Sequence, residues 1–81
     1  FLGRRRMIGY SQRVVKINRD ADLRNLGVRL GRYCILHELP VKDVMEFFDV
    51  SKQTVYSWFA GTHIPSKRHA ALINKFLGRI G

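Results

Sequence analysis

The sequence has one cysteine and no long apolar run. The single cysteine, Cys34, excludes a disulfide within the chain and is typical of a protein from a reducing compartment. No apolar segment approaches the roughly 20 residues that a membrane-spanning helix needs. Residues 1–19 are too polar for the apolar core of a secretory signal. We therefore expect a cytoplasmic protein with no membrane segment.

Acidic residues are few, and they are absent from both ends of the chain. Six Asp and Glu face 15 Lys and Arg, which gives a net charge of +9. All six carboxylates lie within residues 20–49, so residues 1–19 and 50–81 carry only positive charge. This balance favours a polyanionic partner, with nucleic acid first and an anionic membrane second. A solubilising surface would have the same charge balance, so charge alone leaves these interpretations open.

The chain is also short, and its reactive side chains are scattered. With 81 residues, of which 46% are hydrophobic, it predicts one small globular domain without room for a large catalytic cavity. Cys34 has no evident activating base nearby in the sequence, and Cys34, His37, His63 and His69 lack the spacing of metal ligands. We therefore expect no enzymatic activity, no metal, no cofactor and no small-molecule ligand.

The first 19 residues predict a flexible basic arm. They contain Gly3, Gly9 and the triplet Arg4, Arg5 and Arg6, and they show no sustained helical period. Residues 13–17 are rich in β-branched side chains and could form a short strand.

Residues 20–81 predict an all-α domain, a compact four- to five-helix bundle. Asp20 or Asp22 is the expected cap of a first helix that ends before Pro40. The apolar face of this helix follows from spacings of three and four residues: Leu23, Leu26, Leu30, Tyr33, Cys34 and His37. Three further helices are expected over 41–48, 52–60 and from Ser66 to about residue 77. Ser51 would cap the helix over 52–60, and Gly61 would end it.

Two short helices joined by the three residues Asp49, Val50 and Ser51 are typical of a helix-turn-helix. The segment 50–58, V-S-K-Q-T-V-Y-S-W, is followed by Gly61 and Pro65 and resembles the pattern of the lambda-repressor and Cro-like (XRE-type) DNA-binding family. Residues 26–30, L-G-V-R-L, resemble the start of that family's first helix, and the likeness covers roughly residues 22–78. The chain departs from the family at Asp49, Met45 and Pro40, where glycine, alanine and a Ser or Thr cap are common.

The resemblance implies that the helix over 52–60 reads the major groove of double-stranded DNA. Three apolar residues would then hold this helix to the core: Val50, Val55 and Trp58. Tyr56 points outward and could be either a base contact or solvated surface. The resemblance assigns base reading to Lys52, Gln53, Tyr56 and Ser57. It assigns phosphate contacts to Ser51, Thr54, Thr62, His63, Lys67 and Arg68. Arg4, Arg5 and Arg6 would lie in a minor groove or along phosphates, or would be an ordinary solvated charge run.

The function that these features favour is transcription regulation by a repressor or Cro-type homodimer from a bacterium or phage, acting at the nucleoid or in the infected cell. The last helix could provide the dimer face through Ile73, Phe76, Leu77 and Ile80, or these residues could close the core. Two other functions stay open. The domain could be a protein-interaction adaptor or antitoxin-like module, or it could be the DNA-binding piece of a larger recombinase.

Overall fold

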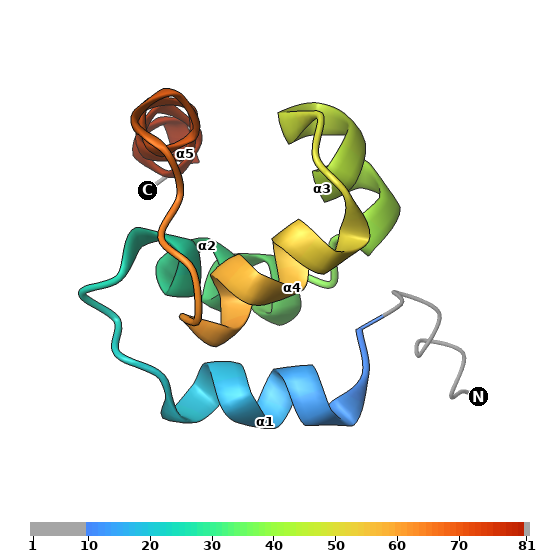
Figure 1. Cartoon of the computed structure of the whole chain (residues 1–81). Helices are drawn as coiled ribbons and strands as arrows, with labels where there is room; N and C mark the ends of the chain where they lie inside the picture. Colours follow the sequence, from blue (N-terminus) through green and yellow to red (C-terminus); the bar gives the residue numbers. More distant parts are fainter. Residues whose placement is uncertain (1–9, 81) are drawn as a thin grey trace.

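The computed structural model describes residues 10–80, apart from the side chains of residues 79 and 80, and every regular element in this part is an α-helix (Figure 1). The predicted all-α class is therefore confirmed for the described residues, which contain no strand. The five helices are α1 (Gln12–Asp20), α2 (Leu26–Leu36), α3 (Val41–Phe48), α4 (Lys52–Ala60) and α5 (Lys67–Ile80). Arg4, Arg5 and Arg6 of the predicted arm lie outside the described residues.

The helix α1 corrects the prediction for the start of the chain. Residues 13–17 are helical rather than a strand, and residues 10–19 are not a flexible arm. The Ser11 side chain accepts a hydrogen bond from the backbone N–H of Val14 and so caps the helix. Val14 and Asn18, four residues apart, are buried on one face of α1. Tertiary packing of this face outweighs the modest strand preference of the β-branched residues.

The helix α2 begins later than predicted. Its cap is Asn25, whose side chain accepts a hydrogen bond from the backbone N–H of Gly27, rather than Asp20 or Asp22. Asp22 instead pairs with Arg24 at 2.9 Å, on the surface of the loop between α1 and α2. Leu23, predicted to lie on the apolar face of this helix, precedes α2 and is 45% exposed. Helix α2 ends at Leu36, before Pro40 as predicted.

A left-handed residue ends each of the helices α3 and α4. Asp49 ends α3 with φ 56° and ψ 54°, a conformation that aspartate tolerates better than most residues. Ser51 then caps α4 by accepting a hydrogen bond from the backbone N–H of Thr54, as predicted. Gly61 ends α4 at φ 80°, where a side chain would be strained, so its predicted role as a helix stop is confirmed. At the start of α5, the Ser66 side chain accepts a hydrogen bond from the backbone N–H of His69.

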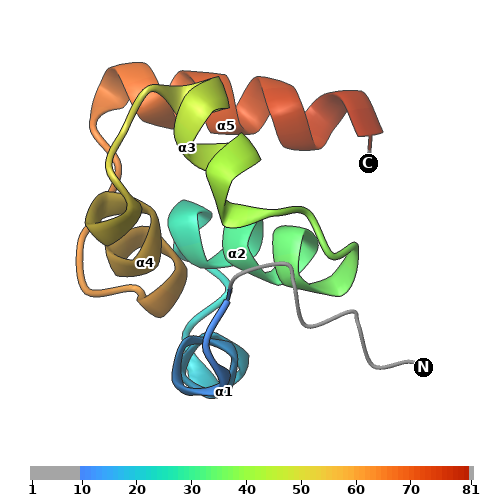
Figure 2. The ribbon, with the colours of Figure 1, turned by 90° about the vertical axis from the view of Figure 1, so that its right-hand side faces the viewer.

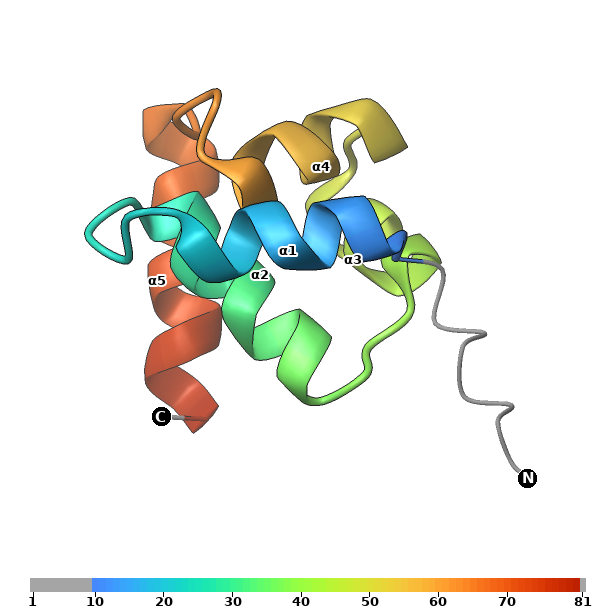
Figure 3. The ribbon, with the colours of Figure 1, turned by 90° about the horizontal axis from the view of Figure 1, so that it is seen from below.

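Helix α4 lies in the middle of the fold. It packs against α1, α2 and α3, and Figure 2 shows α1 and α5 at opposite ends of the molecule. Seen from the α1 end in Figure 3, α1 runs beside α4 and covers one end of the helical core. The largest fully buried apolar side chains of the core are Phe59, Leu30, Ile73, Val28 and Val55. Helix α4 is therefore fixed from several sides, and its remaining surface faces away from the core.

A buried asparagine joins α1 to its neighbours. The Asn18 amide nitrogen donates to the carbonyl oxygens of Phe59 (2.8 Å) and Val28 (3.1 Å), and its amide oxygen accepts from the Arg32 guanidinium (3.1 Å). The helices can approach this closely because residue 31 is glycine. A Cβ atom there would lie 2.6 Å from both the Asn18 side-chain nitrogen and the Phe59 ring. A single polar side chain thus connects α1, α2 and α4.

Candidate nucleic-acid interface

The free surface of α4 carries the residues that the sequence predicted to read bases. Val55, Trp58 and Phe59 are buried on the opposite side of the helix. Lys52 and Gln53 are exposed, whereas Tyr56 and Ser57 are half-buried. All four predicted base-reading residues line one groove between α4 and α1, which we call the first groove. Ala60, Thr62 and residues of α1 complete its lining. The structure therefore brings the four together.

A second groove runs along the other side of α4. Gln53, Thr54 and Ser57 line it from α4, and its opposite wall includes His63, Ser66 and His69. Gln53 and Ser57 line both grooves, so they lie on the ridge between them; we call this pair the α4 crest. A helix surface with a shallow depression on each side is a shape that can enter a groove in a partner.

The predicted phosphate-binding residues fall into three places. Ser51 and Thr54 lie at the start of α4, where their hydroxyl oxygens are 3.0 Å apart. Thr62 and His63 are exposed after the end of α4, and the Thr62 hydroxyl donates to the Ser57 carbonyl oxygen at 3.3 Å. The remaining pair, Lys67 and Arg68, is exposed in the first turn of α5. Four of the six therefore lie near the ends of α4, and the other two lie at the start of α5.

The two aromatic residues of α4 have different surroundings. Trp58 is 3% exposed and packs edge-on against Phe48, with ring centroids 5.9 Å apart, so its predicted place in the core is confirmed. The Tyr56 ring lies 6.4 Å from the Tyr10 ring, and burial raises the pKa of the Tyr56 phenol. Tyr56 thus contributes to the contact between α4 and the α1 end while also lining the first groove.

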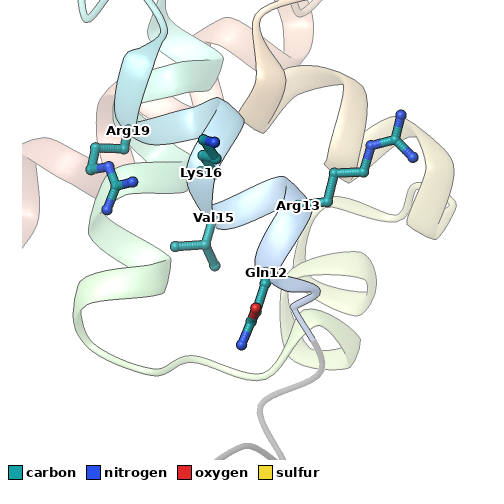
Figure 4. Close-up of a pocket in the computed structure, with 5 residues that line it drawn as sticks. All are labelled: Gln12, Arg13, Val15, Lys16 and Arg19. Carbon is teal, nitrogen blue, oxygen red and sulfur yellow. The ribbon is translucent and has the colours of Figure 1, made fainter.

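Arg13 was not among the predicted site residues, but it lies beside them. It lines the first groove from α1, opposite Lys52 and Gln53. Figure 4 shows Arg13 and Arg19 pointing to different sides of α1, with Arg13 on the side of α4. The serine cap at Ser11 could have indicated a helix here, but no local signal in the sequence shows that Arg13 lies beside α4.

Cys34 has the surroundings of a core residue. Its side chain is 1% exposed, and burial raises the pKa of its thiol to about 12. A thiol that stays protonated is a poor nucleophile and a poor metal ligand. Within the described residues, no three His, Cys, Asp or Glu side chains gather where they could hold a metal ion.

An apolar surface lies where α3 and α5 meet, away from the α4 crest. Phe47 is 60% exposed and its ring lies 5.6 Å from that of half-buried Phe76. Both residues line a pocket of about 220 Å³ together with Cys34, Leu39, Asp43, Val44 and Phe48. Leu77 is half-buried, whereas Ile73 is fully buried and closes the core. Of the two alternatives for Ile73, a dimer contact or a residue that closes the core, the structure shows the second, and the Ile80 side chain lies outside the described part.

Comparison with family models, curated proteins and solved structures finds no match to this chain. None of the helices within residues 10–80 combines the length and apolar character needed to cross a bilayer.

Proposed function

We propose that this chain binds double-stranded DNA sequence-specifically, with α3, residues 49–51 and α4 acting as a helix-turn-helix of the lambda-repressor and Cro type. The observation that carries the proposal is the α4 crest, Gln53 and Ser57, standing between two grooves while the opposite side of α4 is buried. An α-helix with its side chains is about 10–12 Å wide, and the major groove of B-DNA is about 12 Å wide. The free side of α4 matches that groove.

The chemistry of the exposed side chains supports base reading. The Gln53 amide nitrogen can donate to N7 of adenine while its amide oxygen accepts from the N6 amino group, the bidentate pair typical of glutamine with adenine. Lys52 can donate to O6 and N7 of guanine, and the Ser57 hydroxyl can serve either base. Tyr56 adds an aromatic edge at the wall of the first groove.

The charges around α4 support contact with the DNA backbone. Lys67 and Arg68 are exposed at the start of α5, and no carboxylate lies in residues 50–81. Ser51, Thr54, Thr62 and His63 supply further donors at the two ends of α4. Contacts of this kind fix the orientation of a protein on the duplex, whereas base contacts specify sequence.

We propose further that the chain acts as a homodimer on a two-fold operator, as expected of a transcription regulator. The apolar surface around Phe47 and Phe76 supports this part of the proposal, because such surfaces mark contacts with other proteins. The same surface would serve an adaptor that binds a different protein, which is the second candidate function.

Selection of bound duplexes from a random pool tests DNA recognition. We expect a recovered motif with two inverted half-sites about 34–36 Å apart. Gln53→Ala should lose about 1–3 kcal/mol of discrimination at one position of each half-site. The matched control is Gln12→Ala, which removes the same side chain from an exposed site at the start of α1.

Two outcomes would contradict the proposal. One is a pool from which no motif emerges, with binding that disappears as salt rises, as for any polycation. The other is a motif that Gln53→Ala and Gln12→Ala alter equally, because recognition would then not involve the α4 crest.

Sedimentation equilibrium tests the dimer. Phe47→Glu should shift the chain toward a monomer, whereas Ile64→Glu should not, although Ile64 is an even more exposed apolar residue (81%). A monomeric wild-type chain that forms a stoichiometric complex with a different purified protein would favour the adaptor instead.

A further inference from the structure

Helix α1 carries a cation beside the surface proposed to meet DNA. Building on the DNA-binding function proposed above, we propose that α1 is a backbone-binding element and that Arg13 contacts a phosphate at the edge of the major groove that α4 occupies. This role adds a contact from a helix that lies before the segment resembling the repressor family.

The position of α1 relative to α4 is fixed by one buried hydrogen bond between them and by contacts at both ends of α1. Asn18 donates to the Phe59 carbonyl oxygen in the last turn of α4 at 2.8 Å. The Arg32 guanidinium of α2 donates to the backbone carbonyl oxygens of Asn18 (2.9 Å) and Arg19 (3.0 Å) at the end of α1. At the other end, the Tyr10 ring packs against Phe59 with centroids 5.5 Å apart. A cation on α1 is therefore held at a defined place next to α4.

The side chain of Arg13 lies on the side of α1 that borders α4. Arg13 and Ile17 form one wall of the first groove, and Lys52 and Gln53 form the other. Figure 4 shows Arg19 on a different side of the helix, away from Arg13. Of these two arginines, only Arg13 lines the groove beside the α4 crest.

The spacing of packed helices places α1 over the DNA backbone rather than in the groove. Packed helix axes lie about 8–10 Å apart. With α4 centred in a major groove about 12 Å wide, the groove wall begins about 6 Å from the α4 axis. An adjacent helix at about 8–10 Å therefore lies above the sugar-phosphate wall, where a long cationic side chain meets phosphate oxygens.

Arg13 is available for such a contact. Its side chain is exposed. Within residues 10–80, Arg13 forms no salt bridge, since the salt bridge found there joins Arg24 to Asp22. A phosphate contact would therefore not require Arg13 to leave a carboxylate. Guanidinium groups suit phosphate because their planar donors match its oxygens in pairs.

The test compares Arg13→Gln with Arg19→Gln, which remove the same charge from α1, in one case inside the first groove and in the other outside it. Dissociation constants for the selected duplex and for a scrambled duplex are measured between about 50 and 200 mM salt. Loss of one phosphate contact lowers the slope of log K against log salt by about 0.9, which corresponds to about eightfold weaker binding near 0.1 M. We expect this change for Arg13→Gln on both duplexes and a clearly smaller one for Arg19→Gln. Circular dichroism melts should show both variants folded.

Phosphate ethylation interference locates the contact. Ethylation of one particular phosphate in each half-site should block binding by the wild-type chain. Ethylation of the same phosphate should not affect binding by Arg13→Gln. If the selected motif is recovered but the two variants behave alike and interference is unchanged, the role of Arg13 is refuted while the proposed function stands. If the wild-type chain selects no motif, the proposed function fails and the role of Arg13 fails with it.

Discussion

Replacing Asn18 with alanine should destabilise the fold by separating α1 from α2 and α4. Asn18 is 1% exposed, and it both donates and accepts hydrogen bonds in the core. The Phe59 carbonyl lies in the last turn of α4, where carbonyl oxygens have no amide partner within the helix. Removal of the Asn18 amide would leave this oxygen buried without a donor.

The size of the effect follows from the contacts that are lost. A hydrogen bond contributes about 1 kcal/mol net, and a buried polar group left unpaired costs about 1–3 kcal/mol. The Val28 carbonyl and the Arg32 guanidinium keep other partners or solvent access, so most of the cost comes from the unpaired Phe59 carbonyl. We expect the free energy of unfolding to fall by about 3 kcal/mol. For a domain of this size, each kcal/mol lowers the melting temperature by about 4–8 °C, so the expected fall is about 12–24 °C.

Thermal and urea unfolding followed by circular dichroism would measure this loss. Lys16→Ala is the matched control, because Lys16 is an exposed residue of the same helix and its replacement should change the melting temperature little. A fall below about 4 °C for Asn18→Ala would refute the reasoning, since it would mean that the hydrogen bonds of Asn18 do not hold α1 in place.

Three smaller predictions concern other buried or strained positions. Gly31→Ala should cost about 1–3 kcal/mol in urea unfolding, because the new Cβ would lie 2.6 Å from the Phe59 ring; unchanged stability would show that α2 and α4 move apart easily. Asp49→Gly should stabilise the chain by about 0.5–1 kcal/mol, because glycine adopts φ 56° without strain; a lower melting temperature would contradict this. Burial raises the pKa of Cys34 to about 12, so a thiol reagent at pH 8 should label it far more slowly in the native chain than in guanidinium; equal rates would contradict its burial.

Much of the helical core could be predicted because its signals are local and periodic. The helices over 41–48 and 52–60 have the predicted bounds, Ser51 and Gly61 adopt the conformations that their residue types favour, and Asp49 adopts one that aspartate tolerates. Helix α1 was missed because its buried face pairs Val14 with a polar residue, Asn18. Periodicity of apolar residues does not reveal a buried polar group whose partners lie up to 41 positions away in the sequence.

The candidate site was predictable only in part for the same reason. The turn before α4 indicated which side of that helix faces outward, and the four predicted base-reading residues do line one groove. Arg13 joins that groove through packing between segments about 40 residues apart, which no local pattern encodes. The arginines of the predicted arm, Arg4, Arg5 and Arg6, lie outside the described residues and stay a prediction.

The way α4 is held bears on how it could recognise a sequence. Its start is capped by Ser51, its end by Gly61, and one of its last carbonyls by Asn18, while Val55 and Phe59 are fully buried. Under the proposed function, the backbone of α4 need not be ordered on binding, and the conformational entropy lost there would be that of the side chains that contact bases and phosphates. A rigid α4 flanked by α1 keeps Gln53 and Arg13 at a fixed separation, because both belong to one packed unit. If both contact the same half-site, a shift of α4 along the groove would move the cation off its phosphate. The backbone contact would then help to set the register in which the bases are read.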